Sequence, residues 1–217
     1  MDVLRRRLLL ASFALALPAC KKKPPATTGS GVGATKTRPI GPFSSIKVAG
    51  VEFIVSVGKQ APLEVSGDDN LLSYVSTQIE GTTLVIRREA KLKQLQPLRV
   101  RVGSERLERV LAGAGARGSI EGVSGEAFEL EATGGAKVTV RGSSGALKVS
   151  VRGPTRLDLS GFSARRGVVT ATDVSSIELG YLEELDATLS GLSRVSYLGE
   201  PKLTQNVTQP ARLSRRR

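Results

Sequence analysis

Apolar and polar residues alternate between residues 110 and 213 in a short pattern that recurs six times along the chain. The copies begin 18 to 20 residues apart, at Val110, Phe128, Leu147, Gly167, Leu185 and Leu203. Ten residues after each start lies an aliphatic residue: Ile120, Val138, Leu157, Ile177, Val195 and Leu213. Because successive side chains of a strand point to opposite faces, this period of two predicts two strands per copy, each with one buried face.

Turn-forming residues separate the two strands of each copy, since Gly and Asp tolerate positive φ and Pro restricts φ. These bends are Thr133-Gly134-Gly135, Arg152-Gly153-Pro154, Thr172-Asp173-Val174, Ser190-Gly191-Leu192 and Thr208-Gln209-Pro210. A second series of glycines follows the second strand, at Gly122, Gly142, Gly161, Gly180 and Gly199. Two strands and two bends per period predict an all-β fold, a single-stranded parallel β-helix or β-solenoid, with right-handed coils expected from the usual crossover chirality. A β-sandwich with evenly spaced strands is the alternative.

The segment 43–106 predicts strands in a less regular pattern, around residues 46–48, 51–57, 63–65, 84–86 and 98–102. We expect it to form an irregular β-rich cap over the N-terminal end of the coils, together with their first strands. Asp68, Asp69 and Asn70 precede Leu71 and Leu72, which predicts one or two helical turns with an Asp cap. A calcium loop is the weaker interpretation, because the spacing and the closing Glu of an EF-hand are missing.

The N-terminal 19 residues predict a secretory signal peptide, with a basic head that contains Arg5, Arg6 and Arg7 and a short apolar core at 8–17. Cys20 is the single cysteine and stands where cleavage is expected. It resembles the cysteine of a bacterial lipobox, which is lipid-modified and anchors the protein without spanning the membrane. An ordinary signal with an unrelated cysteine is the alternative. By resemblance to enterobacterial lipoproteins, Lys21 after Cys20 favours the outer membrane.

The chain therefore divides into a lipoprotein signal peptide at 1–19, the lipidated Cys20 with a flexible tether at 20–42, and a solenoid at 43–217. The tether is expected because Lys, Pro, Gly, Thr and Ser dominate its composition. Within the solenoid we expect the cap and first strands at 43–106, repeated coils at 107–214 and a basic tail at 215–217.

The composition limits the chemistry of the chain. There is no His, so His-dependent catalysis is excluded, and assigning Cys20 to lipid leaves no thiol nucleophile and no zinc site of Cys and His ligands. Asp158 and Glu178 are expected to be neighbours on adjacent coils, where they could share a proton or hold calcium, but a solvated strand face is the favoured interpretation. We expect no enzyme, no cofactor and no metal.

A series of cations lies beside the aliphatic position of the repeat. The residues nine after each start are Ser119, Lys137, Arg156, Ser176, Arg194 and Arg212. Stacked coils would align Lys137, Arg156, Arg194 and Arg212 as a candidate polyanion-binding stripe, and a solubilising face is the alternative. The net charge is +12, but aromatic residues are only 4% of the chain, which disfavours nucleic acid as the partner.

Two stretches precede the repeats, Phe43-Ser44-Ser45-Ile46-Lys47-Val48 and Gly67-Asp68-Asp69-Asn70-Leu71-Leu72, and a third, Tyr197-Leu198-Gly199-Glu200-Pro201, lies just before the last copy. With the Gly-flanked strand pairs between them, they resemble the putative auto-transporter adhesin head GIN domain family over residues 43–214. The resemblance implies a β-helical envelope domain with a role in adhesion.

These features predict a lipid-anchored, non-catalytic binding or adhesion module of the bacterial cell envelope, with an anionic polysaccharide as the candidate ligand. The alternative is an envelope scaffold or signalling protein that binds another protein. A polysaccharide-active enzyme is the third and weakest hypothesis.

Overall fold

The computed structural model describes residues 26–89 and 91–216, which form an all-β protein with many strands. The predictions for the signal peptide, for Cys20 and for Arg217 lie outside the described residues. The helix within the described ranges is a short 3-10 helix, Asp69–Tyr74, and no helix there is long and apolar enough to cross a bilayer.

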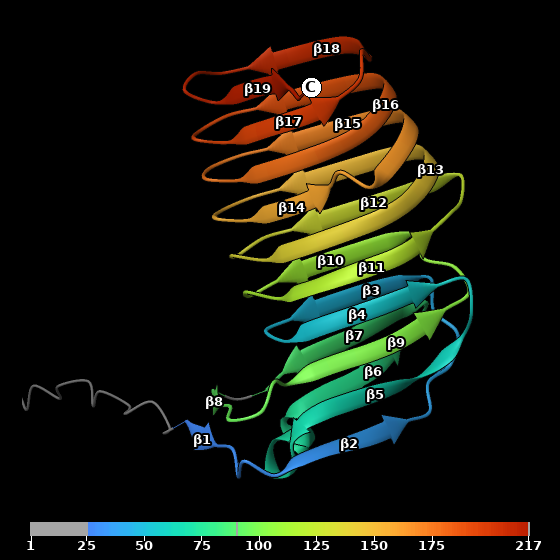
Figure 1. The fold of residues 1–217 in the computed structure, drawn as a ribbon, viewed down its shortest axis with the longest axis vertical. Helices are drawn as coiled ribbons and strands as arrows, with labels where there is room; N and C mark the ends of the chain where they lie inside the picture. Colours follow the sequence, from blue (N-terminus) through green and yellow to red (C-terminus); the bar gives the residue numbers. More distant parts are fainter. Residues whose placement is uncertain (1–25, 90, 217) are drawn as a thin grey trace, which may run out of the picture.

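Parallel strands stack along the long axis of the molecule in two ladders (Figure 1). The first ladder contains, in spatial order, β7 (Thr83–Arg88), β3 (Ser45–Ala49), β10 (Arg109–Gly113), β12 (Ala127–Ala132), the second part of β13 (Lys137–Val151), β15 (Phe162–Ala171), the second part of β16 (Ser176–Leu189) and β18 (Lys202–Val207). The second ladder contains β9 (Arg99–Ser104), β4 (Glu52–Val57), β11 (Arg117–Val123), the first part of β13, β14 (Arg156–Leu159), the first part of β16, β17 (Arg194–Leu198) and β19 (Arg212–Arg215). We call one pass of the chain through both ladders a coil.

The inward side chains of the two ladders form one hydrophobic core. Val138, Leu157 and Ile177 are at most 3% exposed and lie directly above one another, as the repeat predicts. Burial alternates along the strands with the period of two that the sequence shows, as in β12, whose Phe128, Leu130 and Ala132 are buried. The core is therefore a stack of aliphatic rows between the ladders.

The register predicted for the first copy is wrong by two residues. Val110 pairs with Leu130 instead of Phe128, and Ile120 pairs with Val140 instead of Val138. Phe128 and Leu130 both face the core, so a shift of two residues preserves the alternation and the hydrophobic pattern alone cannot detect it. From Phe128 onward the predicted register is observed.

The bends between the two ladders share one backbone feature. A residue with positive φ lies at the same place in five successive coils: Ala114, Gly134, Gly153, Asp173 and Gly191. The second bend differs from the prediction, because β13 and β16 continue through Gly142 and Gly180 as strands of 15 and 14 residues. Their chain curves from one ladder to the next as a single strand, although its pairing with the neighbouring coil is interrupted at the curve, as between Thr139 and Gly142.

The N-terminal half contributes to the stack as well as to its cap. β3 and β4 pair in parallel with β10 and β11 on one side and with β7 and β9 on the other, so the first coil in sequence lies inside the stack. Three antiparallel strands, β2 (Gly33–Arg38), β5 (Ala61–Asp68) and β6 (Val75–Glu80), cover the end beyond β7 and β9. The short strands β1 (Thr27–Thr28) and β8 (Leu92–Lys93) pair beside this cap.

The Asp68-Asp69-Asn70 segment begins a 3-10 helix, but Asp68 makes no side-chain capping hydrogen bond to it. Its buried carboxylate instead accepts hydrogen bonds from the backbone N–H groups of Gly31, Leu95 and Gln96, at 2.8, 3.0 and 3.1 Å. Desolvation opposes the charge, but these three donors outweigh it and lower the pKa of Asp68 below its usual 3.8. Asp68 thus joins three segments of the cap.

Both ends of the segment that was predicted as a solenoid differ from the expectation. Part of the predicted tether is the strand β2, because its backbone completes the antiparallel ladder with β5. At the other end, where a basic tail was expected, Arg215 and Arg216 form ion pairs with Glu200 and Glu178, each at 2.7 Å.

Candidate functional site

The predicted cations occupy one structural position, the first residue of a strand in the second ladder. Lys137, Arg156, Arg194 and Arg212 begin β13, β14, β17 and β19, directly after the bend between the ladders. The backbone N–H of each donates to the carbonyl oxygen of the preceding coil, for example from Arg156 to Ala136 at 3.0 Å. Strand pairing therefore fixes where each cation emerges.

Arg117, which the sequence analysis missed, is the first member of this row. It pairs with Lys137, whereas Ser119 pairs with Thr139, because the register of the first copy is shifted. The signal in the sequence is the 20-residue separation of Arg117 and Lys137, which lies within the range of the repeat. We call Arg117, Lys137, Arg156, Arg194 and Arg212 the basic row.

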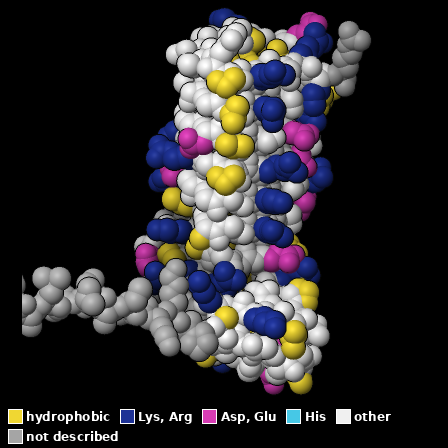
Figure 2. Space-filling model, turned by 90° about the vertical axis from the view of Figure 1, so that its left-hand side faces the viewer, with side chains coloured by type: hydrophobic (Ala, Val, Ile, Leu, Met, Phe, Trp, Pro, Cys, Tyr) yellow, Lys and Arg dark blue, Asp and Glu magenta, His cyan; other side chains and the backbone are white. Residues whose placement is uncertain are grey.

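Strand pairing makes the basic row nearly continuous. Arg117, Lys137 and Arg156 occupy consecutive coils, about 4.8 Å apart by strand spacing. Ser176 interrupts the row for one coil before Arg194 and Arg212 resume it. Figure 2 shows Lys and Arg side chains following one edge of the molecule along its long axis.

All five cations are exposed, and none forms a salt bridge with any residue in the described ranges 26–89 and 91–216. Beyond Arg117 the same strand position is occupied by an acidic residue. Glu52 is the strand partner of Arg117 and forms a salt bridge with Arg99 at 2.7 Å. Like charges about 4 Å apart repel by about 1 kcal/mol even in water. The basic row is therefore a run of positive charge that the described part of the protein does not neutralise.

The carboxylates nearest along the strands are engaged elsewhere. Glu121 pairs with Arg141 at 3.6 Å and Glu178 with Arg216 at 2.7 Å. Asp158 accepts hydrogen bonds from the hydroxyl and the backbone N–H of Ser160, at 2.6 and 3.0 Å.

Asp158 and Glu178 are stacked neighbours, as predicted. The hydrogen bond from the Ser160 hydroxyl lowers the pKa of Asp158, and Glu178 pairs with Arg216 rather than with Asp158. No group of three or more acidic or Cys side chains with the arrangement of a metal site occurs among the described residues.

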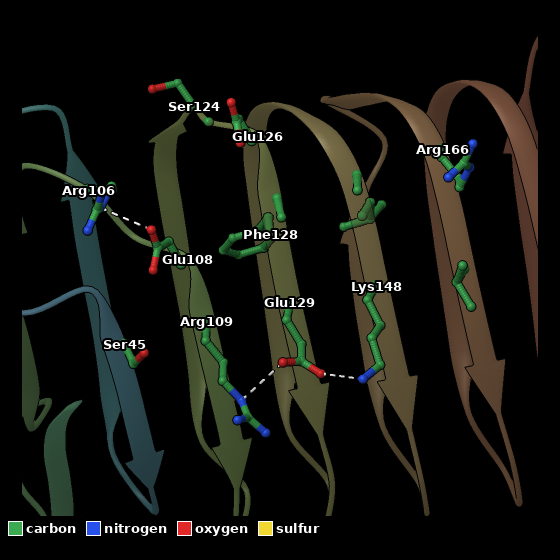
Figure 3. A pocket seen from close by; sticks show the side chains of 15 residues that line it. Ser45, Arg106, Glu108, Arg109, Ser124, Glu126, Phe128, Glu129, Lys148 and Arg166 are labelled. Atoms are coloured by element: carbon green, nitrogen blue, oxygen red, sulfur yellow. Dashed lines mark ion pairs between the residues drawn. The ribbon is translucent and has the colours of Figure 1, made fainter. Parts of the chain in front are cut away.

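A groove of about 810 Å³ lies on the first ladder, where residues 105–108 enter β10 (Figure 3). Its floor is apolar and includes Phe128, Leu147 and Val168, the last of which is 40% exposed. Nothing in the repeat pattern predicts the groove, because it arises where the connection from β9 joins the stack.

Charged side chains at the rim of the groove pair with one another (Figure 3). Glu129 binds Arg109 at 3.3 Å and Lys148 at 2.7 Å, and Arg106 binds Glu108 at 3.1 Å. The hydrogen bond to Glu131 and the charge of Glu129 raise the pKa of Arg109 further above its usual value. Unlike the cations of the basic row, these rim cations have carboxylate partners in the protein.

Comparison of the sequence with family models gives one match, which covers residues 42–201 and is described as putative auto-transporter adhesin, head GIN domain. The chain belongs to this family. The match confirms the resemblance found in the sequence. No curated protein sequence matches this GIN-domain protein.

Solved structures similar to the GIN-domain protein share its fold. A putative adhesin from Parabacteroides merdae is 19% identical, with a TM-score of 0.56 over 88% of this chain and 99% of the other. A putative adhesin from Bacteroides fragilis is 15% identical, with a TM-score of 0.65 over 88% and 99%. A putative lipid binding protein from Parabacteroides distasonis is 18% identical, with a TM-score of 0.55 over 89% and 100%. The family is described as a putative adhesin, which points to the cell surface or envelope.

Proposed function

We propose that this GIN-domain protein is a lipid-anchored, non-catalytic adhesion module that binds an anionic polysaccharide along the basic row. The two ladders are the faces of a right-handed parallel β-solenoid in this proposal, and the solenoid serves as a rigid support for the row. Cys20 carries the lipid and anchors the protein to the outer membrane. The observation that carries the proposal is the line of five exposed cations without a salt-bridge partner among the described residues.

An extended polyanion fits this surface because its charges recur at intervals along a line. Each anionic group that meets the row relieves repulsion between neighbouring cations, and it displaces counterions from the polymer. The fixed backbone positions limit the ordering cost to the ends of the side chains.

The test is binding of the predicted mature chain, residues 20–217 with Cys20→Ser, to polygalacturonate across a salt series. Among the described residues, the buried members of the hydrophobic core lie within 43–211, and the truncation removes none of them. We expect binding that weakens as salt rises, and a loss of at least about tenfold in the variant R117E/K137E/R156E/R194E/R212E, because each contact is electrostatic.

The matched control is K36E/K59E/K91E/K93E/K202E, which has the same net charge but changes exposed lysines outside the row. It is expected to bind polygalacturonate much better than the row variant. Equal losses in the two variants would show that only net charge matters, and unchanged binding in the row variant would contradict the proposal.

The groove on the first ladder favours a second candidate, an envelope scaffold that binds another protein. An apolar floor with a polar rim is the usual anatomy of a protein-binding surface. This candidate predicts that Val168→Arg abolishes capture of the partner while polygalacturonate binding persists.

A further inference from the structure

Apolar side chains form a second row at the tips of the bends, directly beside the basic row. Pro154, Val174, Leu192 and Pro210 each lie two residues before the first strand residue of the second ladder in four consecutive coils. All four are exposed, with Val174 at 56% and Leu192 at 53%. Figure 2 shows a column of hydrophobic side chains next to the Lys and Arg side chains over the C-terminal half of the molecule. We call these four residues the apolar tips.

Strand pairing and contacts between bends keep the tips in line. The backbone N–H of Gly153 donates to the carboxylate of Asp173 at 3.1 Å, which ties one bend to the next. A Cβ built on Gly191 would lie only 2.9 Å from the backbone of Asp173, so these two bends are also in close contact. Successive tips are therefore about one strand spacing apart and form a continuous apolar ridge.

Val and Leu are uncommon residues at the exposed tip of a bend. Positions with positive φ favour Gly, Asn and Asp, and Asp173 and Gly191 already supply that conformation. Val174 and Leu192 follow these residues and point away from the core, so they add nothing to its packing. Single exposed apolar residues are ordinary, but an aligned row of them indicates a surface that meets a partner.

The two halves of the edge differ at these positions. The corresponding residues of the first two repeated coils are Gly115 and Gly135, next to Arg117 and Lys137. At these two bends the position that corresponds to an apolar tip has no side chain. In the C-terminal half, Arg156, Arg194 and Arg212 each have an apolar tip two residues away.

We propose that the C-terminal half of this edge docks on a bilayer surface that carries anionic lipid headgroups. The apolar tips enter the boundary between headgroups and acyl chains, while Arg156, Arg194 and Arg212 meet the phosphates. This inference rests on the proposed function in one respect, since the same cations are taken to meet an anion. The inference goes beyond the proposed function because it assigns the four apolar tips, which are not part of the basic row, to contact with a membrane.

Charge and shape both fit this occupant. Apolar residues beside Lys and Arg are the composition of surfaces that lie in a membrane interface, and long basic side chains can keep their charged ends at headgroup level while their stems follow the apolar residues. In Figure 2 the hydrophobic side chains form a straight column along the long axis. A flat surface can therefore touch all four tips at once.

The experiment is cosedimentation of the predicted mature chain, residues 20–217 with Cys20→Ser, with two kinds of vesicle. One is phosphatidylcholine alone and the other contains phosphatidylglycerol as well. Replacing Cys20 removes any acyl chain that would mask binding by the edge. We expect binding only to the anionic vesicles, and about tenfold weaker binding for V174N/L192N, which removes two large apolar tips and leaves every charge in place.

The matched control is V32N/L95N, which changes two residues of similar exposure, 60% and 56%, in the N-terminal part of the chain. It should bind anionic vesicles as the parent chain does. Both pairs of substitutions lie on the surface, so we expect the variants to remain folded. Circular dichroism checks this.

Polygalacturonate binding, measured on the same samples, separates this inference from the proposed function. V174N/L192N is expected to bind the polysaccharide as the parent chain does. Vesicle binding that is equal in V174N/L192N and the parent, or absent from the parent, would overturn the membrane inference and leave the polysaccharide proposal standing. If the parent chain binds vesicles through the tips but does not bind polygalacturonate, the membrane inference is supported and the polysaccharide proposal is contradicted.

Discussion

At the scale of single residues, exceptions to the repeat have local compensations. Gly167 occupies a position filled by Leu147 in the preceding coil and Leu185 in the following one. A Cβ on Gly167 would lie 2.8 Å from a methyl group of Leu182, so Leu182 fills the space that a larger residue would need. The buried carboxylate of Asp68 is compensated in a similar local way, because it accepts hydrogen bonds from three backbone N–H groups.

The lowered pKa of Asp68 predicts acid sensitivity of the cap. A carboxyl with a depressed folded-state pKa stabilises the fold above its usual value of 3.8, and this contribution is lost as pH falls from there through the lowered pKa. We expect Asp68→Asn to unfold at a lower urea concentration than the parent at pH 7, and its stability to fall less than that of the parent as pH drops below 3.8.

Urea titrations followed by circular dichroism at several pH values measure this effect. Asp69→Asn is the control, because Asp69 is exposed and accepts from Ser30 and from the Asn70 N–H at the surface. An Asp68→Asn chain with the same pH profile as the parent would show that the three hydrogen bonds do not stabilise the charged form.

At the scale of the element, one coil is the unit of construction. Leu185 and Leu203 occupy equivalent positions, and Arg194 and Arg212 do so in the second ladder. Stability in such a stack is approximately a sum over coils and their interfaces. Whole coils should therefore be removable, whereas fractions of a coil should not.

Deletion of residues 185–202 removes one coil and joins Glu184 to Leu203 in the correct register. We expect a folded chain with a melting temperature lowered by less than about 10 °C, because each remaining strand keeps an equivalent neighbour. Deletion of 185–193 is the control, since it brings a second-ladder strand into the first ladder and should melt the C-terminal end. Calorimetry distinguishes the two, and equal damage from both deletions would contradict the coil as the unit.

At the scale of the whole molecule, positive charge is distributed unevenly. Arg109, Arg141, Arg166 and Arg215 have carboxylate partners, whereas the basic row has none among residues 26–89 and 91–216. The row is thus a local cost to stability that ligand binding would offset. Surfaces retained for binding commonly carry such a cost.

Neutralising two neighbours in the row is therefore expected to stabilise the protein. K137Q/R156Q should raise the free energy of unfolding by about 0.5 kcal/mol at low salt, because it removes repulsion between adjacent coils. The gain should vanish near 1 M salt, where the screening length is about 3 Å. Arg109→Gln is the contrasting variant, since it removes paired charge and should lose up to about 1 kcal/mol. A loss of stability in K137Q/R156Q at low salt would show that the row is compensated in a way that the salt bridges do not reveal.

The sequence by itself determined the parts of this protein that depend on local periodicity. Alternation of apolar and polar residues specifies strands with one buried face, and Gly153 and Asp173 mark bends that need positive φ. The aligned positions of Lys137, Arg156, Arg194 and Arg212 follow from the same period, which is why the row could be predicted before the structure.

Only the tertiary structure decided what depends on contacts between distant segments. Period two does not distinguish a shift of two residues, so strand pairing was needed to bring Arg117 into the row. The place of β3 and β4 inside the stack depends on the chain returning past them from β9 to β10. Pairing of Glu178 with Arg216, 38 residues away, leaves the basic row free, and such a choice depends on side-chain geometry that no local pattern encodes.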